Sequence, residues 1–550
     1  MPGSAGELAE RLVASLDPEQ RAAATLPDGP ALIIAPAGSG KTTTLIARLG
    51  VLLSRGIPPE QIAVATFNRE AALELTARIR ARVVPTVPDA GRIEVRTLHA
   101  LARQVLLDVG TGTNLVSDRL PLLRAVLRRA AAHAGADDPP LPDVAALDTA
   151  ISAWKVERRP AAHSSLIDDF QALLATRGAL DFDDLVVGAA DALESDARLR
   201  LRWQSRFSHV CVDEFQDVDA AQLRLVRLLA EPQRNLFVVG DDDQTIYAWR
   251  LADVRRILSF ESSYPGARRV QLATNYRCPA PVVGISRNLI AVNRERFTKR
   301  IDPSPAAASS VESIQAVSTA DPDWPEAFAR LAADEARADR TVCFLSRTRA
   351  ELGPILLALT RAGVPHTTSV PAAVQAEPVQ RLVAAARALA AEPHPYHVFL
   401  NLRAGHGWRR ADAGDALGDD DHAALDALLG WAVGFRRLDQ FLEAHDRALA
   451  RLVALRVPDA PIELVTVHGA KGREWQTVVV LGMEEERFPN RRALVDAADP
   501  ARAVEEERRL AYVALTRATR RLILAFDPAR ASRFLAEMGL TTPSLGVKRG

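Results

Sequence analysis

One short segment combines the residue types that hold a phosphate. Residues 35–42 read APAGSGKT and lie between an aliphatic run and a segment with helical periodicity. Gly38 and Gly40 allow backbone amides to point toward an anion at the positive end of a helix. Lys41 is one of five lysines in a chain with 64 arginines. Its compact ammonium fits inside such a loop, whereas the fork of an arginine is too bulky. The order of strand, glycine-rich loop and helix predicts a phosphate-binding loop, with Thr42 as a magnesium ligand.

A pair of carboxylates follows a second apolar run. HVCV at residues 209–212 is followed directly by Asp213 and Glu214. A magnesium nucleotide requires such groups: we expect Asp213 to hold the metal through water and Glu214 to orient and deprotonate the attacking water. A solvated acidic loop is the alternative interpretation. Together with the phosphate-binding loop, the pair predicts hydrolysis of a nucleotide.

The segment ahead of the loop is typical of a helix start. LDPEQ at residues 16–20 offers Asp17 as the N-cap, Pro18 in the first turn and Gln20 as the second member of a capping box. A role of Gln20 in reading an adenine edge is equally compatible with these residues, so both interpretations stay open.

Ten short runs of β-branched and aliphatic residues must position these groups. They alternate with amphipathic helical patterns, which predicts an α/β protein with two units built on mostly parallel sheets. Residues 105–180 and 376–460 are rich in Ala, Leu and Arg, have helical periodicity and are expected to be helical insertions. The ten runs are ALIIA, QIAVATF, RIEVRTL, HVCVDE, LFVVGD, VESIQAV, TVCFLS, IELVTV, TVVVLG and RLILAF.

Composition sets wide limits on function. The chain has 550 residues, of which 48% are apolar and 25% charged, as is usual for a folded multidomain protein. Its formal net charge is zero, so a nucleic-acid site must rest on local patches. The three cysteines are far apart and favour a reducing compartment over disulfides or a metal site. The sequence has neither a leader pattern nor a run of about 18 apolar residues, so we expect a cytoplasmic protein without a membrane partner.

Ten blocks, in order along nearly the whole chain, resemble the superfamily 1 DNA helicases of the UvrD, Rep and PcrA type. The resemblance implies two RecA-like P-loop NTPase motor domains, with ATP and Mg²⁺ at their interface, and 3′ to 5′ movement on single-stranded DNA. The blocks are LDPEQRAA, APAGSGKT, ATFNREAALEL, RTLHALA, LDFDDL, VDEFQD, VVGDDDQTIYAWR, TNYRCP, VTVHGAKGREW and EEERRLAYVALTRAT.

The resemblance implies the residues of the nucleotide site. Gln20 would read the adenine edge and Tyr276 would stack on its face. Gln244 would sense the γ-phosphate, which Arg277 and Arg517 would reach from the second motor domain. The expected ATP-binding residues are Gln20, Ala37, Gly38, Ser39, Gly40, Lys41, Thr42, Thr43, Tyr276, Arg277, Glu474 (on the ribose) and Arg517; the expected catalytic residues are Lys41, Asp213, Glu214, Gln244, Arg277 and Arg517; the expected magnesium ligands are Thr42 and Asp213.

The residues around Arg517 support its role independently. Leu510, Val513 and Arg517 fall at positions i, i+3 and i+7 of a predicted helix, which places a permanent charge along an apolar stripe. A buried arginine needs an anion, because an unpaired buried charge is very unfavourable. Snorkelling, or hydrogen bonds to carbonyls at the helix C-terminus, is the alternative.

Aromatic residues predict the DNA contacts. Tyr247 and Trp249 are two residues apart, so an extended segment would project both to one side, where they would stack on a base; packing in a core is the alternative. Stacking contributes roughly 1–3 kcal/mol per base and tolerates any sequence, as a translocating motor requires. The basic stretch at residues 293–300 would form a solvated helix face or, less favoured, touch phosphate. With the resemblance, the expected DNA-binding set is Phe67, Asn68, Thr97, His99, Tyr247, Trp249, Arg250 and His468.

Three departures from the family pattern change what is expected. Thr43 stands where relatives have an arginine that sandwiches adenine, so base stacking falls to Tyr276. ATFNRE is one residue shorter than the usual form around Phe67. The second insertion, residues 376–460, is much shorter than in relatives, which favours translocation over unaided unwinding.

The expected domain organisation follows the motifs. A first motor domain spans residues 1–104 and 181–273, with the first insertion at 105–180; a second spans 274–375 and 461–530, with the second insertion at 376–460 and a tail at 531–550. We expect an ATP-dependent 3′ to 5′ DNA helicase and single-stranded DNA translocase in repair or recombination, with single-stranded and 3′-tailed duplex DNA as partners. The alternative is an ATPase subunit that serves a nuclease or repair protein without unwinding DNA itself. An ATPase that assembles into filaments or rings is disfavoured, because both arginine fingers lie within this one chain.

Overall fold

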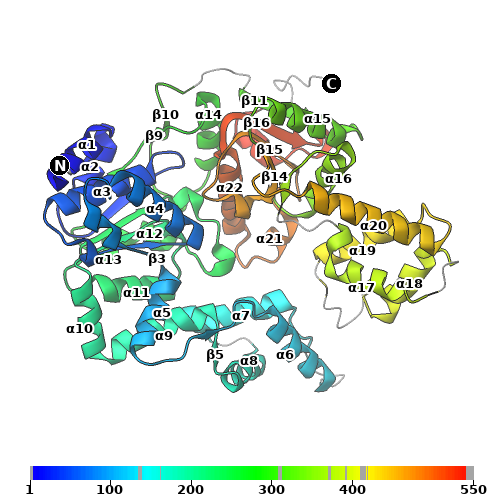
Figure 1. The fold of residues 1–550 in the computed structure, drawn as a ribbon, viewed down its shortest axis with the longest axis horizontal. Coiled ribbons are helices and arrows are strands. Elements are labelled where there is room, and N and C mark those ends of the chain that lie inside the picture. Colours follow the sequence, from blue (N-terminus) through cyan, green and yellow to red (C-terminus); the bar gives the residue numbers. More distant parts are fainter. Residues whose placement is uncertain are drawn as a thin grey trace. The chain divides into compact units, whose positions relative to one another are not determined.

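The protein consists of two compact units, each with its own parallel sheet (Figure 1). The first unit comprises Met1–Arg277 and Asn293–Ala306, and the second comprises Cys278–Val292 and Ala307–Gly550. The computed structural model describes residues 4–133, 139–160, 163–307, 313–368, 373–389, 393–408, 417 and 419–540. The tail is therefore described only as far as residue 540.

Six parallel strands form the sheet of the first unit, in the order β3-β2-β6-β7-β1-β8. Alternate side chains enter two cores: Ile33 and Val64 pack with helices α3 and α4 on one face, and Val212 and Val238 pack with α5, α9 and α11 on the other. Strands covered on both faces read as continuous apolar runs. The strands are β1 (Ala31–Ile34), β2 (Ile62–Thr66), β3 (Glu94–Thr97), β6 (His209–Val212), β7 (Leu236–Gly240) and β8 (Arg268–Gln271).

The helices of this unit begin at polar caps and present apolar faces to the sheet. Asp17, Asp181 and Asp219 each form a complete capping box at the start of a helix. The helices are α1 (Ala5–Ala14), α2 (Pro18–Ala24), α3 (Lys41–Ser54), α4 (Arg69–Arg82), α5 (Leu98–Asp108), α9 (Phe182–Ser195), α10 (Ala197–Arg206), α11 (Ala220–Ala230), α12 (Arg255–Leu258) and α13 (Phe260–Ser263). A short parallel pair, β9 (Thr274–Asn275) and β10 (Asp302–Pro303), joins the two chain segments of the unit.

The segment between α5 and α9 forms a small helical layer with its own apolar cluster. Leu123, Ile151 and Phe170 lie at the centre of this cluster and are fully buried. Its elements are β4 (Asn114–Leu115), α6 (Leu120–His133), α7 (Val144–Glu157), α8 (Ser164–Thr176) and β5 (Ala179–Leu180).

The second unit repeats the arrangement with six parallel strands in the order β11-β16-β15-β12-β14-β13. Phe344, Leu464 and Val479 pack against helices α15 and α16 on one face. The strands are β11 (Ile314–Ser318), β12 (Val342–Ser346), β13 (Thr367–Thr368), β14 (Ile462–Thr466), β15 (Trp475–Val480) and β16 (Ala518–Phe526); the helices are α14 (Ala280–Ile290), α15 (Trp324–Arg337), α16 (Gly353–Ala362), α21 (Arg491–Val495), α22 (Pro500–Leu515) and α23 (Arg533–Glu537).

Four helices between β13 and β14 form a second helical layer. Leu382, Phe399, Leu425 and Phe441 are buried in its apolar cluster. The helices are α17 (Glu377–Ala386), α18 (Pro395–Gly405), α19 (Asp419–Ala432) and α20 (Leu438–Leu455).

The predicted α/β class with parallel sheets is confirmed, and each of the ten predicted runs contains a strand. Two strands of the six-stranded sheets were not predicted. One is β8, which carries two exposed arginines, and the other is β13, which has only two residues. The expected domain boundary lies at residue 274, whereas Thr274–Arg277 and Asn293–Ala306 group with the first compact unit. Asn275 explains part of this, since its Nδ2 donates to the Ala37 carbonyl over 2.8 Å.

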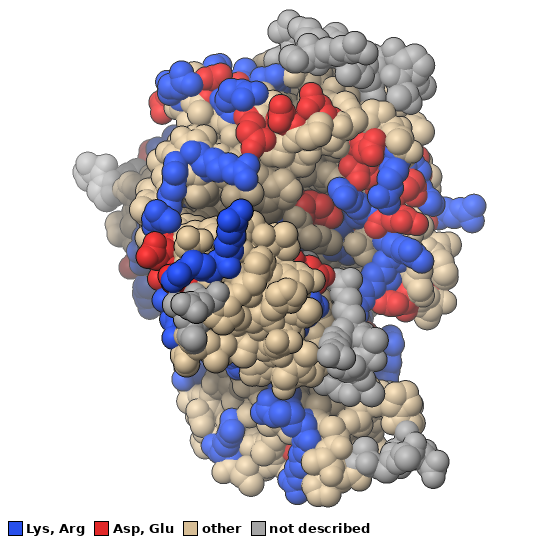
Figure 2. Space-filling model, turned by 90° about the vertical axis from the view of Figure 1, so that its right-hand side faces the viewer, with Lys and Arg blue, Asp and Glu red and all other residues tan. Residues whose placement is uncertain are grey.

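The surface carries charges of both signs. On the face in Figure 2, basic and acidic side chains lie among uncharged areas, and neither sign covers the face alone. This agrees with the zero net charge of the chain. In the described part of the chain, no helix has both the length and the apolar character needed to cross a membrane.

Candidate nucleotide and nucleic-acid sites

The glycine-rich loop closes tightly against the end of β9 and the residues that follow it. Gly38 and Gly40 have φ angles of +71° and +80°, in the left-handed region that favours glycine. A Cβ on Gly38 would lie 2.8 Å from the Oδ1 of Asn275 and 2.8 Å from the Cβ of Arg277. A Cβ on Gly40 would lie 2.5 Å from the Nε2 of Gln20. A side chain at Gly38 or Gly40 would therefore be both strained and crowded.

This loop fits a polyphosphate. Gly40 is the N-cap of α3 and offers no side-chain cap, so the first amides of the helix are available to an anion. Ser39 is buried, and its Oγ has no hydrogen-bond partner among the described residues. Lys41 begins α3, and Thr42 and Thr43 follow it, all three partly exposed. Ala37 is fully buried beneath the loop.

Gln20 and Tyr276 lie beside the loop, and both form hydrogen bonds with Asp17, the N-cap residue of α2. The predicted capping box is present: the Asp17 Oδ1 accepts from the Gln20 backbone N–H over 2.7 Å, and the Gln20 Oε1 accepts from the Asp17 N–H over 3.3 Å. The Gln20 Nε2 also donates to the Ser39 carbonyl over 2.9 Å. Tyr276 donates from its hydroxyl to the Asp17 Oδ2 over 2.6 Å, and half of its surface is exposed. An exposed ring held by its hydroxyl is suited to stacking on a flat base.

The two carboxylates after β6 lie next to Lys41. The Lys41 Nζ lies 3.4 Å from the Glu214 Oε1. Glu214 has a φ of +52°, an unusual conformation for a non-glycine residue that marks a constrained position. Burial, with a further contribution from Glu214, raises the pKa of Asp213 to about 7. Thr42 and Asp213 offer the oxygen ligands that Mg²⁺ prefers, and a bound Mg²⁺ would neutralise phosphate charge.

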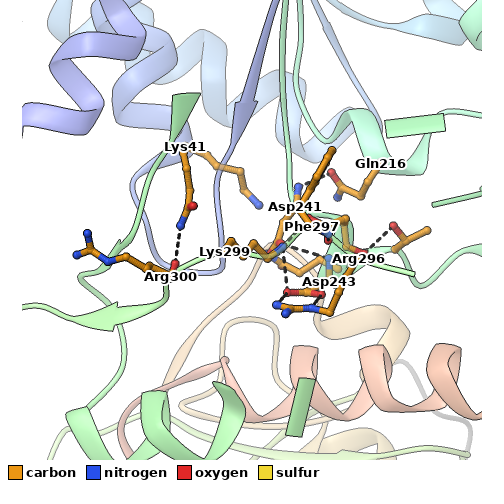
Figure 3. Close-up of polar contacts among 12 residues, drawn as sticks. Lys41, Gln216, Asp241, Asp243, Arg296, Phe297, Lys299 and Arg300 are labelled. Carbon is orange, nitrogen blue, oxygen red and sulfur yellow. Dashed lines mark hydrogen bonds and ion pairs between the residues drawn. The ribbon is translucent and has the colours of Figure 1, made fainter. Parts of the chain in front are cut away.

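Gln244 contacts a buried ionic cluster, of which Figure 3 shows Asp241, Asp243, Arg296 and Lys299. Its Nε2 donates to the Asp241 Oδ2 over 2.7 Å. The Nζ of Lys299 lies 2.6, 2.5 and 2.9 Å from oxygens of Asp241, Asp242 and Asp243, and all four side chains are fully buried. The interpretation of residues 293–300 as a solvated helix face is therefore wrong: the segment has no helix, and its Lys299 binds carboxylates.

A second cation completes this cluster. Arg296 binds the Asp243 carboxylate in a bidentate pair, through Nε at 2.9 Å and Nη2 at 2.7 Å. Burial raises the pKa of Asp242 to about 6. At Asp243 the same burial is outweighed by Lys299 and Arg296, which lower its pKa. Burial would lower the pKa of Lys299, but the three carboxylates raise it.

The predicted arginine fingers lie in different units. Arg277 is the last residue of the first segment of unit one, and its backbone N–H donates to the Asn275 Oδ1 over 2.9 Å. Arg517 belongs to unit two and is almost fully buried. Its expected position within a helix is wrong, because α22 ends at Leu515. The Arg517 Nε donates to the Val513 carbonyl over 2.9 Å, which is the contact expected from the alternative interpretation.

Two further predicted residues lie in the second unit. His468 lies in a short 3-10 turn, Val467–Ala470, and is partly exposed. Glu474 is exposed and directly precedes β15. The structure thus divides the predicted nucleotide set between the two units.

Three aromatic rings of the first unit form a partly exposed cluster. Phe67 and Tyr247 stack, with ring centroids 4.8 Å apart and planes at 21°. Trp249 lies edge-on to Tyr247, with centroids 6.3 Å apart, and 56% of its surface is exposed. The Arg250 guanidinium lies over the Trp249 ring at 4.7 Å. The expectation of an extended segment is wrong, because Ala248–Arg250 form a 3-10 turn, yet the rings still gather.

The remaining predicted DNA contacts lie at helix starts. Asn68 and Thr97 are the N-caps of α4 and α5, and each side chain accepts a backbone N–H. His99 follows in α5 and packs edge-on against Phe182, with centroids 5.4 Å apart. Burial lowers the pKa of His99. A neutral imidazole beside an exposed aromatic ring is suited to contact with a base or sugar.

Two family models match the chain, one for the UvrD/REP helicase N-terminal domain over residues 16–123 and 142–265 and one for the UvrD-like helicase C-terminal domain over residues 436–527. The ATP-dependent DNA helicase UvrD2 of Mycobacterium tuberculosis (strain H37Rv) is 30% identical to it, over 94% of this chain and 79% of the relative. The chain belongs to the UvrD/REP helicase family. The ATP-dependent DNA helicase PcrA of Staphylococcus epidermidis (strain RP62A) is 27% identical, over 96% of this chain and 87% of the relative. This UvrD-type protein is accordingly an ATP-hydrolysing DNA helicase.

Sequence reasoning missed four residues near the helicase motifs. Asn275 bridges to the loop, Gln216 donates to Glu214 and Phe182 packs on His99. Lys299 binds the carboxylates after β7. All four had a usable signal: Lys299 is a rare lysine, and Phe182, Gln216 and Asn275 lie inside the blocks LDFDDL, VDEFQD and TNYRCP.

Proposed function

We propose that this helicase hydrolyses magnesium-bound ATP at the glycine-rich loop and moves 3′ to 5′ along single-stranded DNA, separating 3′-tailed duplexes on its way. The contact of Lys41 with Glu214 carries the proposal, because it places a phosphate-binding ammonium beside a carboxylate that can act as a base. The same unit holds the exposed aromatic cluster of Phe67, Tyr247 and Trp249. The first unit therefore contains groups suited to binding ATP and groups suited to binding single-stranded DNA.

Each residue of the loop region has a distinct part in hydrolysis. The backbone amides from Gly38 to Thr42 and the Lys41 ammonium bind phosphate oxygens, and Thr42 and Asp213 hold the magnesium. Glu214 accepts a proton from the attacking water. The Gln244 amide contacts the γ-phosphate, and Tyr276 stacks on the adenine while Gln20 contacts its edge. Neutralising developing charge and fixing geometry are the main contributions of a protein to phosphoryl transfer.

The aromatic cluster binds single-stranded DNA irrespective of its base sequence. A base that stacks on Trp249 or inserts beside Phe67 gains contact area irrespective of its identity. Asn68, Thr97, His99, Arg250 and His468 complete the proposed DNA-binding set. Arg277, Glu474 and Arg517 complete the proposed nucleotide set. Motion follows if the two units alternate between conformations that hold DNA with different strength.

The cellular process that the protein serves follows from its DNA substrate. A motor that acts on 3′-tailed and single-stranded DNA serves repair or recombination in the cytoplasm. A nuclease or repair protein is a natural partner for such a motor.

Strand separation by the protein alone tests the proposal. We expect ATP-dependent separation of a 3′-tailed duplex, at least about tenfold faster than separation of a 5′-tailed duplex of the same sequence, because the motor loads on the tail. Lys41→Ala should abolish both strand separation and DNA-stimulated ATP hydrolysis. ATP hydrolysis without separation of either duplex would contradict unaided unwinding. Preference for the 5′ tail would contradict the polarity.

A further inference from the structure

Lys299 is the most deeply buried cation that contacts the ATP-site motifs. Its ammonium lies 2.5 to 2.9 Å from three carboxylates, and its side chain has no exposed surface. It belongs to the segment Asn293–Ala306, which returns to the first unit after α14. Burying four charges together is costly, so a cluster of this kind must be well satisfied to persist.

Asp241 is the member of the cluster that faces the ATP-site motifs. One of its oxygens accepts from the Lys299 Nζ at 2.6 Å, and the other accepts from the Gln244 Nε2 at 2.7 Å. Its backbone N–H donates to the Gln216 Oε1 at 3.0 Å. Asp241 thus contacts two amide side chains and one cation.

These contacts fix the orientation of both amides. An ionised carboxylate only accepts hydrogen bonds, so the Gln244 amide must present its NH₂ to Asp241. A backbone N–H only donates, so Gln216 must present its carbonyl to Asp241 and its NH₂ to Glu214. Glu214 in turn lies beside Lys41. A continuous polar path therefore runs from Lys299 through Asp241, Gln216 and Glu214 to Lys41; Figure 3 shows its part around Lys299 and Asp241.

We propose that Lys299 is a positioning residue for ATP hydrolysis, which holds Asp241 so that the Gln244 amide is fixed in the orientation that hydrolysis requires. The inference rests on the proposed role of Gln244. Lys299 touches neither phosphate nor water in this role and acts through Asp241. The segment Asn293–Ala306 thereby becomes part of the catalytic support, although it lies more than fifty residues downstream of Asp241.

Loss of the ammonium would change the hydrogen bonding of Asp241. Asp241 would lose its 2.6 Å partner, and the three buried carboxylates would repel one another more strongly. An Asp241 side chain that Lys299 no longer holds can turn away, so it no longer dictates which end of the Gln244 amide it meets. Gln244 would then sample both orientations, and the fraction of competent enzyme would fall.

The experiment compares Lys299→Met with Arg300→Gln as the matched control. Arg300 is the next residue, is exposed and pairs with Asp302. With saturating single-stranded DNA, we expect Lys299→Met to lower kcat for ATP at least about tenfold while KM changes less than about threefold, and Arg300→Gln to leave both unchanged. A role in folding alone would lower Tm and the active fraction and leave kcat per active site unchanged, which would overturn the inference.

A double-mutant cycle with Gln244→Ala separates the inference from the proposed function. If Lys299 acts through Gln244, adding Lys299→Met to Gln244→Ala lowers kcat less than about threefold further. Independent, multiplying losses would overturn the role of Lys299 but leave that of Gln244 intact. A Gln244→Ala variant with parental kcat would instead refute the proposed role of Gln244.

Asp241→Asn tests the same path without removing the buried ammonium. Its amide keeps an oxygen for Lys299 and turns an NH₂ toward Gln244, which forces the Gln244 amide to reverse. We expect the same loss of kcat at near-parental Tm. This variant decides the inference if Lys299→Met does not fold, because a folded Asp241→Asn protein with parental kcat would overturn it.

Discussion

At the scale of single residues, the rare lysines mark places where a compact cation is required. Lys41 contacts Glu214, Lys155 lies 2.8 Å from both Asp181 and Asp184, and Lys299 contacts three aspartates. Arg119 also contacts Asp181, together with Asp148 and Asp183, from the partly exposed side of that cluster. An ammonium is a point charge that carboxylates can approach from several directions, whereas a guanidinium prefers one planar partner. At these three places an ammonium contacts carboxylates that are largely shielded from solvent.

Gly38 offers a residue-scale prediction about the close approach at the loop. Gly38→Ala places a Cβ 2.8 Å from both Asn275 and Arg277, so the loop or β9 must shift. We expect ATP affinity to fall at least about tenfold and Tm to fall, because the loop no longer matches a polyphosphate. Nucleotide titration by fluorescence and thermal unfolding measure the two effects.

Gly56 provides the control for this prediction. It also has a positive φ, +83°, but nothing lies within 4 Å of the position that a Cβ would take, so Gly56→Ala carries backbone strain alone. That strain is about 1–2 kcal/mol, and ATP affinity should be unchanged. Equal ATP affinity in the two variants would show that the approach of Asn275 to the loop does not shape the site.

The sequence predicted the residues of the site better than their contacts. The glycines, Lys41 and the Asp213–Glu214 pair are local motifs whose spacing is visible directly. The Lys299 cluster joins positions 57 and 58 residues apart through a segment without helix or strand, so periodicity gives no signal for it. Contacts between residues that are far apart in the sequence can be identified only once the three-dimensional fold is known.

At the scale of elements, buried strands were easier to predict from the sequence than the exposed edge strand β8. Strands covered on both faces, such as β2 and β7, are buried throughout and almost entirely apolar, and they were found from the sequence. The edge strand β8 carries Arg268 and Arg269, both exposed, and was missed. The end of α22 was also misplaced, because apolar periodicity continues past Leu515 although the backbone turns there.

The cap of α11 gives an element-scale prediction on pH. Asp219 caps this helix by accepting from the Gln222 N–H over 2.8 Å. Burial, opposed by that bond, raises the pKa of Asp219 to about 6. A carboxyl whose pKa is higher in the folded state than in the unfolded state stabilises the fold when protonated, so this stability is lost as pH rises toward and through 6.

Asp219→Asn should therefore be more stable than the parent at high pH. Asparagine caps as well as aspartate and carries no charge. We expect the free energy of unfolding to be higher by about 1–3 kcal/mol at pH 8, with the difference shrinking toward zero at pH 4. Thermal unfolding of the first unit across this range measures it. Asp196→Asn at the cap of α10 is the control: Asp196 is exposed and its pKa is lowered by backbone hydrogen bonds, so no gain at pH 8 is expected there. A gain in both variants would assign the effect to net charge.

At the scale of the whole molecule, each helical layer has a core separate from its sheet. The cluster around Phe399 and Phe441 contains only residues of the layer between β13 and β14. Among the described residues, the sheet core receives one side chain from this layer, Leu452 near the end of α20. The motor fold of the second unit thus depends little on its insertion for burial.

The chain ends that enclose this layer lie next to each other, which allows a direct test of its independence. His366 and Arg456 are paired in a parallel bridge, so a flexible linker of about six residues can replace residues 369–455. All six strands of the second sheet lie outside the replaced segment. We expect the variant to fold with a modest loss of Tm, because Leu452 is the layer's described contribution to the sheet core, and to keep DNA-stimulated ATP hydrolysis within about threefold of the parent.

Replacing the exposed loop residues Pro458 and Asp459 by Gly-Ser controls for disturbance of the connection to β14. If the shortened protein loses ATP hydrolysis while the control retains it, the layer is part of the motor; if hydrolysis persists, strand separation by the same protein then measures what the layer adds on duplex DNA.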